Sequence, residues 1–165
     1  MGARPEFLSL ADLIAGITGS QQPLGEQPPV RIDSVGIDSR LAKPGSLFVA
    51  LRGERRDGHE FIPEAIAKGA AVVLAERDPQ IGSCAVLDLH SELPQEGGRQ
   101  VGTPLCLIVP DSLAALQRAA AYWRRQHDVT VIAVTGSVGK TTSKEVIAAV
   151  ERQRYCTLAS KASYN

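Results

Sequence analysis

The sequence is poor in aromatic residues, has a single methionine and carries no excess of either charge. Only 4% of its 165 residues are Phe, Trp or Tyr, and 18 Lys and Arg balance 18 Asp and Glu. A balanced charge gives no long-range attraction to the phosphates of DNA or RNA, and no basic stretch is interleaved with aromatic residues. The composition therefore argues against a nucleic-acid partner.

Long apolar runs are also missing. No stretch approaches the roughly 20 apolar residues needed to cross a bilayer, and residues 1–6 lack the apolar segment of a signal peptide. We therefore expect no membrane insertion and a cytoplasmic location, and we expect the chain to be a monomer.

Cysteine is scarce and widely spaced, at Cys84, Cys106 and Cys156. This spacing does not suggest a disulfide or metal framework, so we expect small core residues of a reduced protein. The three histidines have no Cys or His neighbours at the spacing of zinc ligands, so we expect no zinc site.

The chain does contain a glycine turn between an apolar run and a helical pattern, near its C-terminal end. Residues 131–134 (Val-Ile-Ala-Val) predict a buried strand, and Lys140 to Val150 has helical apolar spacing. The turn reads Thr-Gly-Ser-Val-Gly-Lys-Thr-Thr over residues 135–142. Backbone N–H groups of such a turn, together with the positive end of the following helix dipole, bind phosphate groups.

The residue types in this turn are those that phosphate binding requires. Gly136 and Gly139 let the backbone approach a phosphate without a Cβ in the way. Lys140 can reach the terminal phosphates, and the Thr141 hydroxyl can ligate Mg²⁺. Val134 stands where the pattern G-x-x-x-x-G-K-[ST] has glycine, so the match is to a tighter variant. A strand–helix turn without a ligand is the alternative.

The preceding residues predict an α/β fold in which short strands alternate with helices. Ser9 and Asp12 form a capping box for a helix over residues 10–17, with Gly19 placed to end it. Asp111 caps a long helix with a core-facing stripe at Leu113, Leu116, Ala120 and Trp123. A third helix is expected over residues 61–70, and strands over residues 30–38, 46–51, 71–75, 85–87 and 105–109, with a further strand from Cys156.

We place a domain boundary after residue 126. Residues 1–126 then form a small α/β domain, and residues 127–165 form the first strand, turn and helix of a second domain. A nucleotide-binding domain has about 100–150 residues. We therefore expect the chain to be the front part of a longer enzyme.

Four segments in this order resemble the Mur ligases of bacterial cell-wall synthesis. They are residues 37–40 (Ile-Asp-Ser-Arg), 43–53 (Lys-Pro-Gly-Ser-Leu-Phe-Val-Ala-Leu-Arg-Gly), 57–62 (Asp-Gly-His-Glu-Phe-Ile) and 135–142. The resemblance runs from about residue 32 to residue 165. It implies an N-terminal domain that holds a uridine nucleotide, a central P-loop domain that holds ATP, and a C-terminal domain of Rossmann type.

The resemblance is greatest to the members that join D-Ala-D-Ala to UDP-MurNAc-tripeptide. It implies ATP and Mg²⁺ as cofactors, a phosphorylated peptide carboxylate, and attack by an amine on the resulting acyl phosphate. The sister ligase that adds the third amino acid to UDP-MurNAc-L-Ala-D-Glu is an alternative, although it usually has Asn where this chain has Val138. A non-catalytic uridine-nucleotide-binding module and an unrelated P-loop NTPase are further alternatives. We expect no ligase activity from residues 1–165 alone.

The resemblance also implies roles for individual residues. The ATP phosphate loop corresponds to Gly136, Ser137, Val138, Gly139, Lys140, Thr141 and Thr142, with Lys140 as the catalytic residue and Thr141 as the Mg²⁺ ligand. Uridine-nucleotide contacts correspond to Ile37, Ser39, Arg40, Glu54, Arg55 and Arg56. Asn165 falls in a substrate-contacting segment, where residues 162–163 (Ala-Ser) depart from the usual Gly-Asn.

The residues themselves leave alternatives open for these contacts. Residues 38–40 can be a strand-end turn in which Arg40 is solvated. The arginines near residue 55 can meet a diphosphate or form a solvated loop. Asp57, Gly58 and His59 favour a structural turn over a catalytic base.

Overall fold

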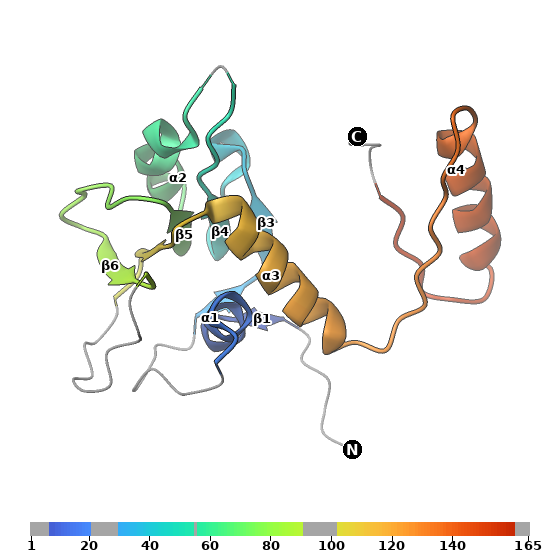
Figure 1. Cartoon of the computed structure of the whole chain (residues 1–165), viewed down its shortest axis with the longest axis horizontal. Helices are drawn as coiled ribbons and strands as arrows, with labels where there is room; N and C mark the ends of the chain where they lie inside the picture. Colours follow the sequence, from blue (N-terminus) through green and yellow to red (C-terminus); the bar gives the residue numbers. More distant parts are fainter. Residues whose placement is uncertain (1–6, 21–29, 55, 91–101, 161–165) are drawn as a thin grey trace. The chain divides into compact units, whose positions relative to one another are not determined.

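The computed structural model describes residues 7–20, 30–54, 56–90 and 102–160. The chain divides into two compact units, Met1–His127 and Asp128–Asn165 (Figure 1). The first contains a sheet and its covering helices, and the second contains the glycine turn. Each unit is described by itself.

The first unit is built on a five-stranded parallel sheet with the order β3-β4-β5-β7-β6. Its strands are β3 (Ser34–Gly36), β4 (Ser46–Val49), β5 (Val72–Ala75), β6 (Ala85–Asp88) and β7 (Leu105–Ile108). A separate antiparallel pair joins β1 (Leu8–Ser9) to β2 (Arg31–Ile32). This parallel sheet with helices confirms the predicted α/β class, and the expected strand over residues 30–38 is two short strands, β2 and β3.

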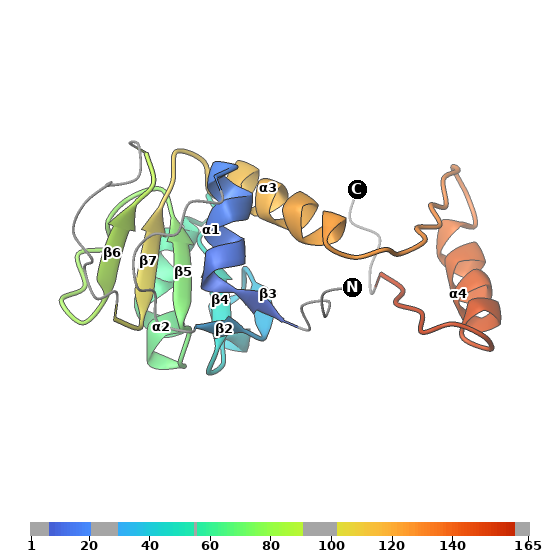
Figure 2. The same ribbon diagram turned by 90° about the horizontal axis from the view of Figure 1, so that it is seen from below.

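Side chains of the three central strands alternate between two cores. Leu47, Val72 and Leu105 face a core that includes helices α1 (Leu10–Thr18) and α3 (Ser112–Arg125). Their neighbours Phe48, Val73 and Cys106 face a second core that includes α2 (Ile62–Ala67). Figure 2 shows α1 and α2 on opposite faces of the sheet. Because both faces are covered, these strands are continuous apolar runs, which is what the sequence shows.

The predicted boundaries of α1 are confirmed. The Ser9 Oγ accepts from Asp12 N at 3.1 Å, and the helix ends at Gly19 with φ of 75°. Within the helix, a Cβ on Gly16 would lie 2.9 Å from Ala119 Cα of α3. Glycine at this position therefore lets the two helix backbones approach closely.

The predicted face of α3 is wrong by about one position. Asp111 caps the helix as expected, and its Oδ1 accepts from Ala114 N at 2.8 Å. The buried residues, however, are Ser112, Ala115 and Ala119, while Leu113 is 49% exposed. Small residues face inward because α1 lies so close, and the larger Leu113 faces solvent.

Two strand predictions in the second unit are also wrong. Residues 131–134 and the residues after Cys156 form no strand, and Val131 and Ile132 are more than half exposed. A strand requires a neighbour for its backbone hydrogen bonds, and no other strand lies among the described residues of this unit. The predicted helix is present as α4 (Lys140–Glu151).

The cysteine prediction holds for two of three residues. Cys84 and Cys106 are buried in the core beside α2, whereas Cys156 is exposed. Burial raises the pKa of the Cys106 thiol to about 12, which makes it an inert core residue. In the described part of the chain, no helix is long and apolar enough to cross a membrane.

Candidate functional site

The glycine turn of the second unit has an open backbone cradle at the start of α4. Gly136 has φ of 144° and Gly139 has φ of 81°, values that side-chain-bearing residues rarely adopt. Gly139 is the N-cap of α4, and no side chain caps this helix. The first turn of α4 contains no acidic residue. The positive end of the helix dipole is therefore left for an anion.

Lys140 folds back over this turn. Its Nζ donates to the Gly136 carbonyl oxygen at 2.6 Å. An ammonium group has three protons, so two remain for phosphate oxygens. The residues between the glycines point outward, and Val138 is 92% exposed. The structure thus brings Gly136, Gly139 and Lys140 together around one small turn.

One further lysine of α4 is held away from the turn. Lys144 Nζ donates to the Ser160 carbonyl oxygen at 2.5 Å and lies 3.1 Å from Glu145 Oε1. A lysine near the start of an amphipathic helix is usually solvated. Lys144 is instead largely covered, because its side chain fastens the segment after α4 to the helix.

In the first unit, the residues predicted to contact the uridine nucleotide follow two neighbouring strands at one edge of the sheet. Residues 37–40 follow β3, and residues 53–56 follow β4 closely. Since β3 and β4 are parallel neighbours, with Gly36 opposite Phe48, their carboxyl ends lie at the same edge. Ligands of open parallel sheets bind outside this edge. Arg55 and Asn165 lie outside the described residues.

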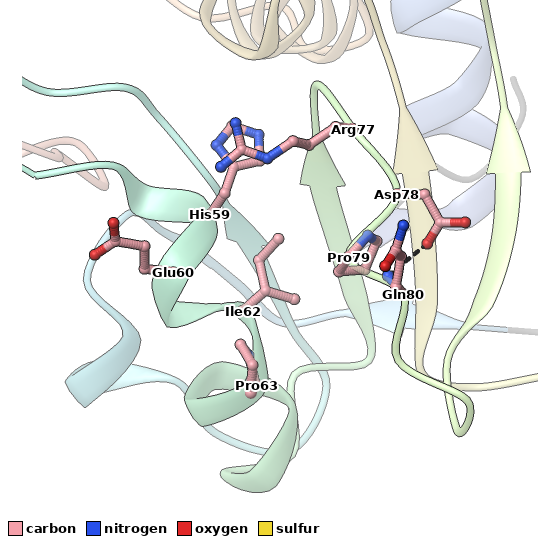
Figure 3. Close-up of a pocket in the computed structure, with 8 residues that line it drawn as sticks. All are labelled: His59, Glu60, Ile62, Pro63, Arg77, Asp78, Pro79 and Gln80. Atoms are coloured by element: carbon pink, nitrogen blue, oxygen red, sulfur yellow. Dashed lines mark hydrogen bonds between the residues drawn. The ribbon is translucent and has the colours of Figure 1, made fainter.

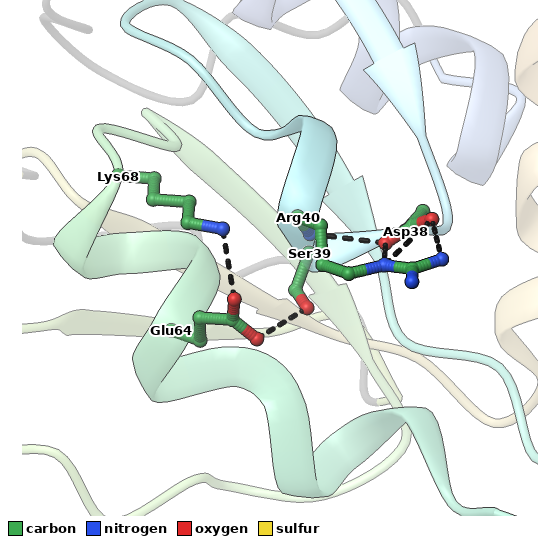
Figure 4. Close-up of polar contacts among 5 residues, drawn as sticks. All are labelled: Asp38, Ser39, Arg40, Glu64 and Lys68. Carbon is green, nitrogen blue, oxygen red and sulfur yellow. Dashed lines mark hydrogen bonds and ion pairs between the residues drawn. The ribbon is translucent and has the colours of Figure 1, made fainter.

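The segment after β3 is an ordered turn (Figure 4). Arg40 Nη2 donates to Asp38 Oδ2 at 2.7 Å, and Arg40 N donates to Asp38 Oδ1 at 3.0 Å. These bonds lower the pKa of Asp38 to about 2. This geometry agrees with the alternative of a strand-end turn: Asp38 caps the turn, and the Arg40 side chain is 79% exposed although its guanidinium pairs with Asp38. Ile37 is 62% exposed beside this pair.

Ser39 is buried, unlike its neighbours in the turn. Its hydroxyl donates to Glu64 Oε2 at 2.7 Å, and Lys68 Nζ donates to Glu64 Oε1 at 2.8 Å (Figure 4). These two bonds, that of Lys68 first, lower the pKa of Glu64. Because the Ser39 proton is engaged by the carboxylate, the Ser39 oxygen can serve a ligand only as an acceptor.

The segment after β4 is a tight turn closed by backbone hydrogen bonds. Gly53 N donates to Arg56 O at 2.9 Å, and Arg52 pairs with Asp57 as an isolated antiparallel bridge. Glu54 and Arg56 are exposed on it. A Cβ on Gly58 would lie 2.6 Å from Leu51 O, so glycine is required there. The turn therefore presents its charged residues to solvent from a fixed base.

His59 belongs to this base. Its side chain is 3% exposed, and its Nδ1 lies 2.6 Å from Asp57 Oδ1. Asp57 also accepts from Arg77 Nη2 at 2.8 Å. The backbone N–H of His59 is the largest of several contacts that hold the pKa of Asp57 well below its usual range. A structural role for Asp57, Gly58 and His59 is what the sequence favoured.

A cleft of about 380 Å³ lies beside His59, between the start of α2 and the segment after β5. Figure 3 shows His59, Ile62 and Pro63 on one side and Arg77 to Gln80 on the other. The Asp78 carboxylate accepts from Gln80 N at 2.7 Å, which shapes the turn after β5. The cleft thus lies at the carboxyl edge of the sheet, as the two predicted substrate segments do.

A sequence profile decides the family. The profile described as the Mur ligase family, catalytic domain, matches residues 31–155, which is most of the chain. The chain belongs to the Mur ligase family. The match includes the strand-end turns of the first unit as well as the glycine turn of the second.

The relatives of the chain within the Mur ligase family include ligases with two different named activities. The UDP-N-acetylmuramoyl-tripeptide–D-alanyl-D-alanine ligases of Synechocystis and Escherichia coli are 42% and 39% identical to the chain, each over 82% of its length. The UDP-N-acetylmuramoyl-L-alanyl-D-glutamate–2,6-diaminopimelate ligase of Syntrophomonas wolfei is 36% identical over 87%. The chain spans about a quarter of the length of these relatives, namely 26%, 25% and 25%.

Solved Mur ligases resemble the chain in structure as well. The MurF ligase of Acinetobacter baumannii has a TM-score of 0.62 at 29% identity, covering 91% of this chain and 29% of its own. The MurF ligase of Thermotoga maritima in complex with ADP has a TM-score of 0.53 at 30% identity, covering 73% of this chain and 23% of its own.

The sequence of this Mur ligase family member did not indicate three residues that support its site. Glu64 binds Ser39 across 25 residues of sequence, and no local pattern predicts that pair. Glu76 and Arg77 directly follow a buried strand. Their place at the carboxyl edge of a predicted parallel strand is the one feature that could have drawn attention to them.

Proposed function

We propose that this chain is the uridine-nucleotide-binding domain and the beginning of the ATP-binding domain of a ligase that adds D-Ala-D-Ala to UDP-MurNAc-tripeptide. The observation that carries the proposal is the glycine turn at the start of α4, with positive φ at Gly136 and Gly139 and Lys140 folded over it. In a Mur ligase family member this is a site for ATP phosphates. The choice of substrate is supported by the relatives that are named UDP-N-acetylmuramoyl-tripeptide–D-alanyl-D-alanine ligases.

The residues of the turn suit a phosphate group. At both glycines the positive φ would strain any side-chain-bearing residue, and no side chain caps α4. ATP and Mg²⁺ would be held by Gly136, Ser137, Val138, Gly139, Lys140, Thr141 and Thr142, with Thr141 as the metal ligand. ATP supplies the phosphoryl group that activates the peptide carboxylate. Lys140 supplies positive charge where negative charge develops during this transfer.

The first unit would hold the UDP part of the substrate at the carboxyl edge of its sheet. Ile37, Ser39 and Arg40, which follow β3, would contact this part of the substrate, as would Glu54, Arg55 and Arg56, which follow β4. Asn165 would also contact the substrate. The acceptor role left to the Ser39 oxygen suits an N–H donor, and uracil presents one at N3. We further propose a cytoplasmic monomer whose other substrates are small molecules.

The sister activity, addition of 2,6-diaminopimelate to UDP-MurNAc-L-Ala-D-Glu, is the second candidate because a ligase of that name is 36% identical. A chimera distinguishes the two candidate functions. In it, residues 1–160 replace the matching segment of the UDP-N-acetylmuramoyl-tripeptide–D-alanyl-D-alanine ligase of Synechocystis. Amide formation is then measured with each pair of substrates. The reciprocal chimera places the same residues in the ligase of Syntrophomonas wolfei. Turnover in the Synechocystis chimera alone supports the first function, and turnover in the Syntrophomonas chimera alone supports the second.

Calorimetric titration of the chain itself tests the division of labour between the units. We expect saturable binding of UDP and weak or absent binding of Mg-ATP, because the sheet of the first unit is complete while the second has a single helix among its described residues. Binding of Mg-ATP without binding of UDP would overturn the assignment of residues 37–56 to the nucleotide substrate.

A further inference from the structure

A closed ring of polar contacts surrounds the base of the turn after β4. The backbones of Arg52 and Asp57 form an isolated antiparallel bridge across this base. Arg52 Nε lies 3.3 Å from Glu76 Oε2, and the N–H of the same Glu76 donates to His59 Nε2 at 2.9 Å. His59 Nδ1 then returns to Asp57 Oδ1 at 2.6 Å. Both ends of the turn are thus tied to the residue that follows β5.

The hydrogen bonds fix the tautomer of His59. A backbone N–H can only donate, so Nε2, which receives the Glu76 N–H, carries no proton. The ring proton therefore lies on Nδ1 and is donated to Asp57 Oδ1. With its side chain 3% exposed and both nitrogens engaged, His59 has no means of exchanging a proton with a substrate. Its effect on the site must act through Asp57 and Glu76.

The two partners of His59 are themselves anchored to the rest of the unit. Asp57 accepts from Arg77 Nη2 at 2.8 Å and from His59 N at 3.0 Å. Glu76 Oε1 accepts from Ser112 N at 3.4 Å, at the start of α3, where the helix dipole favours a carboxylate. The ring therefore joins the turn to two neighbouring elements, β5 and α3.

We propose that His59 is a positioning residue that holds Gly53, Glu54 and Arg56 in the conformation that binds the nucleotide part of the substrate. The inference rests on the proposed function, which assigns Glu54, Arg55 and Arg56 to the substrate. A turn that already has its binding conformation loses less conformational entropy when the ligand binds. Its affinity for the ligand is therefore higher than that of a turn that must first be ordered. Loss of the ring frees the turn and lowers affinity while the sheet beneath it stays folded.

Three substitutions at His59 and one at its neighbour test the proposal. His59→Phe removes both bonds. His59→Asn keeps a donor near the Nδ1 position, and His59→Gln keeps an acceptor near the Nε2 position. Glu60→Gln is the matched control, because Glu60 is the adjacent residue and is exposed.

The measurement is the Kd of each variant of the chain for UDP, by calorimetry, at a temperature where circular dichroism shows every variant fully folded. We expect binding by His59→Phe to be weaker by roughly tenfold to a hundredfold, the cost of losing buried hydrogen bonds. His59→Asn and His59→Gln should each recover part of the loss, and Glu60→Gln should bind as the wild type does. If His59→Phe does not fold, the Asn and Gln variants carry the test.

Two further readouts distinguish positioning from general stability. Hydrogen exchange at the Gly53 and Gly58 amides should be faster in the His59 variants, while exchange in β4 and β5 is unchanged. The ¹⁵N shifts of the wild-type His59 ring should show the Nδ1–H tautomer. Wild-type affinity in all three His59 variants, or the Nε2–H tautomer, would overturn this inference and leave the proposed function standing. A wild-type chain that does not bind UDP would overturn the proposed function itself.

Discussion

The two units of the chain differ in what their residues need from the rest of the protein. In the first, the sheet has both faces covered, and Leu74 and Leu107 are completely buried. In the second, the glycine turn and α4 are formed, but Val131, Val146 and Leu158 are exposed. A helix satisfies its backbone hydrogen bonds within itself, whereas a strand requires a neighbour. The helix is therefore present without a surrounding core, and the strand is not.

The comparison is sharpest for a matched pair of leucines. Leu74 is 0% exposed and Leu158 is 97% exposed. Leu74→Ala should lower the free energy of unfolding by about 2–5 kcal/mol, because it leaves a cavity in the sheet core. Leu158→Ala should change it by less than about 0.5 kcal/mol. Urea unfolding followed by circular dichroism measures both, and equal losses would show that Leu158 packs against a core in solution.

The catalytic contribution of the second unit is tested by Lys140→Ala in the chimeric ligase described above. We expect kcat to fall by about 10²–10³, typical for the loss of one preorganised donor, while the Kd for UDP stays unchanged. Arg152→Ala is the control, since it removes a charge from the other end of α4. Equal losses of UDP affinity and kcat in the Lys140 variant would contradict the division of labour between the units.

A substitution at Gly16 should disrupt the packing of α1 against α3 in the first unit. In Gly16→Ala the new Cβ would lie 2.9 Å from Ala119 Cα, so the helices α1 and α3 must separate, at a cost of about 1–3 kcal/mol. Gly82→Ala is the control, because no atom lies within 4 Å of its Cβ position. Thermal unfolding of the two variants should show a lower Tm only for Gly16→Ala.

The smallest effect is expected from pH. The pKa of Asp57 lies well below its usual range in the folded protein. The unfolded chain therefore binds more protons near pH 4, so the contribution of Asp57 to stability is complete above its unfolded pKa and is lost as pH falls through the folded pKa. Asp57→Asn should have a flatter dependence of unfolding free energy on pH below about 4. An unchanged slope in urea titrations from pH 5 to pH 2 would contradict this.

The sequence predicted what local patterns determine. The capping box at Ser9, the N-cap Asp111 and the strands of the parallel sheet follow from residue type and periodicity, and the α/β class from their alternation. The face of α3 was missed because the close approach at Gly16, far along the chain, decides which residues are buried. The Ser39–Glu64 and His59–Glu76 bonds join distant segments, so no spacing rule could have predicted them.

The roles of the individual site residues stay predictions. The structure gathers Gly136, Gly139 and Lys140 around one turn and brings the segments after β3 and β4 to one sheet edge. No spacing rule predicts which of these side chains touches a nucleotide, because such contacts join segments that are distant in sequence. The titrations and the chimera address this directly.

The packing of α1 against α3 has a consequence for synthesis of the protein. Helix α1 leaves the ribosome before α3, and the surface it covers includes Ala115 and Ala119, about a hundred residues later in the chain. Until α3 emerges, the apolar side of α1 and one face of the nascent sheet have no cover. Contacts so distant in sequence also form slowly. The growing chain should therefore depend on chaperone protection until residue 125 has been released, and α1 and α3 should become protected together.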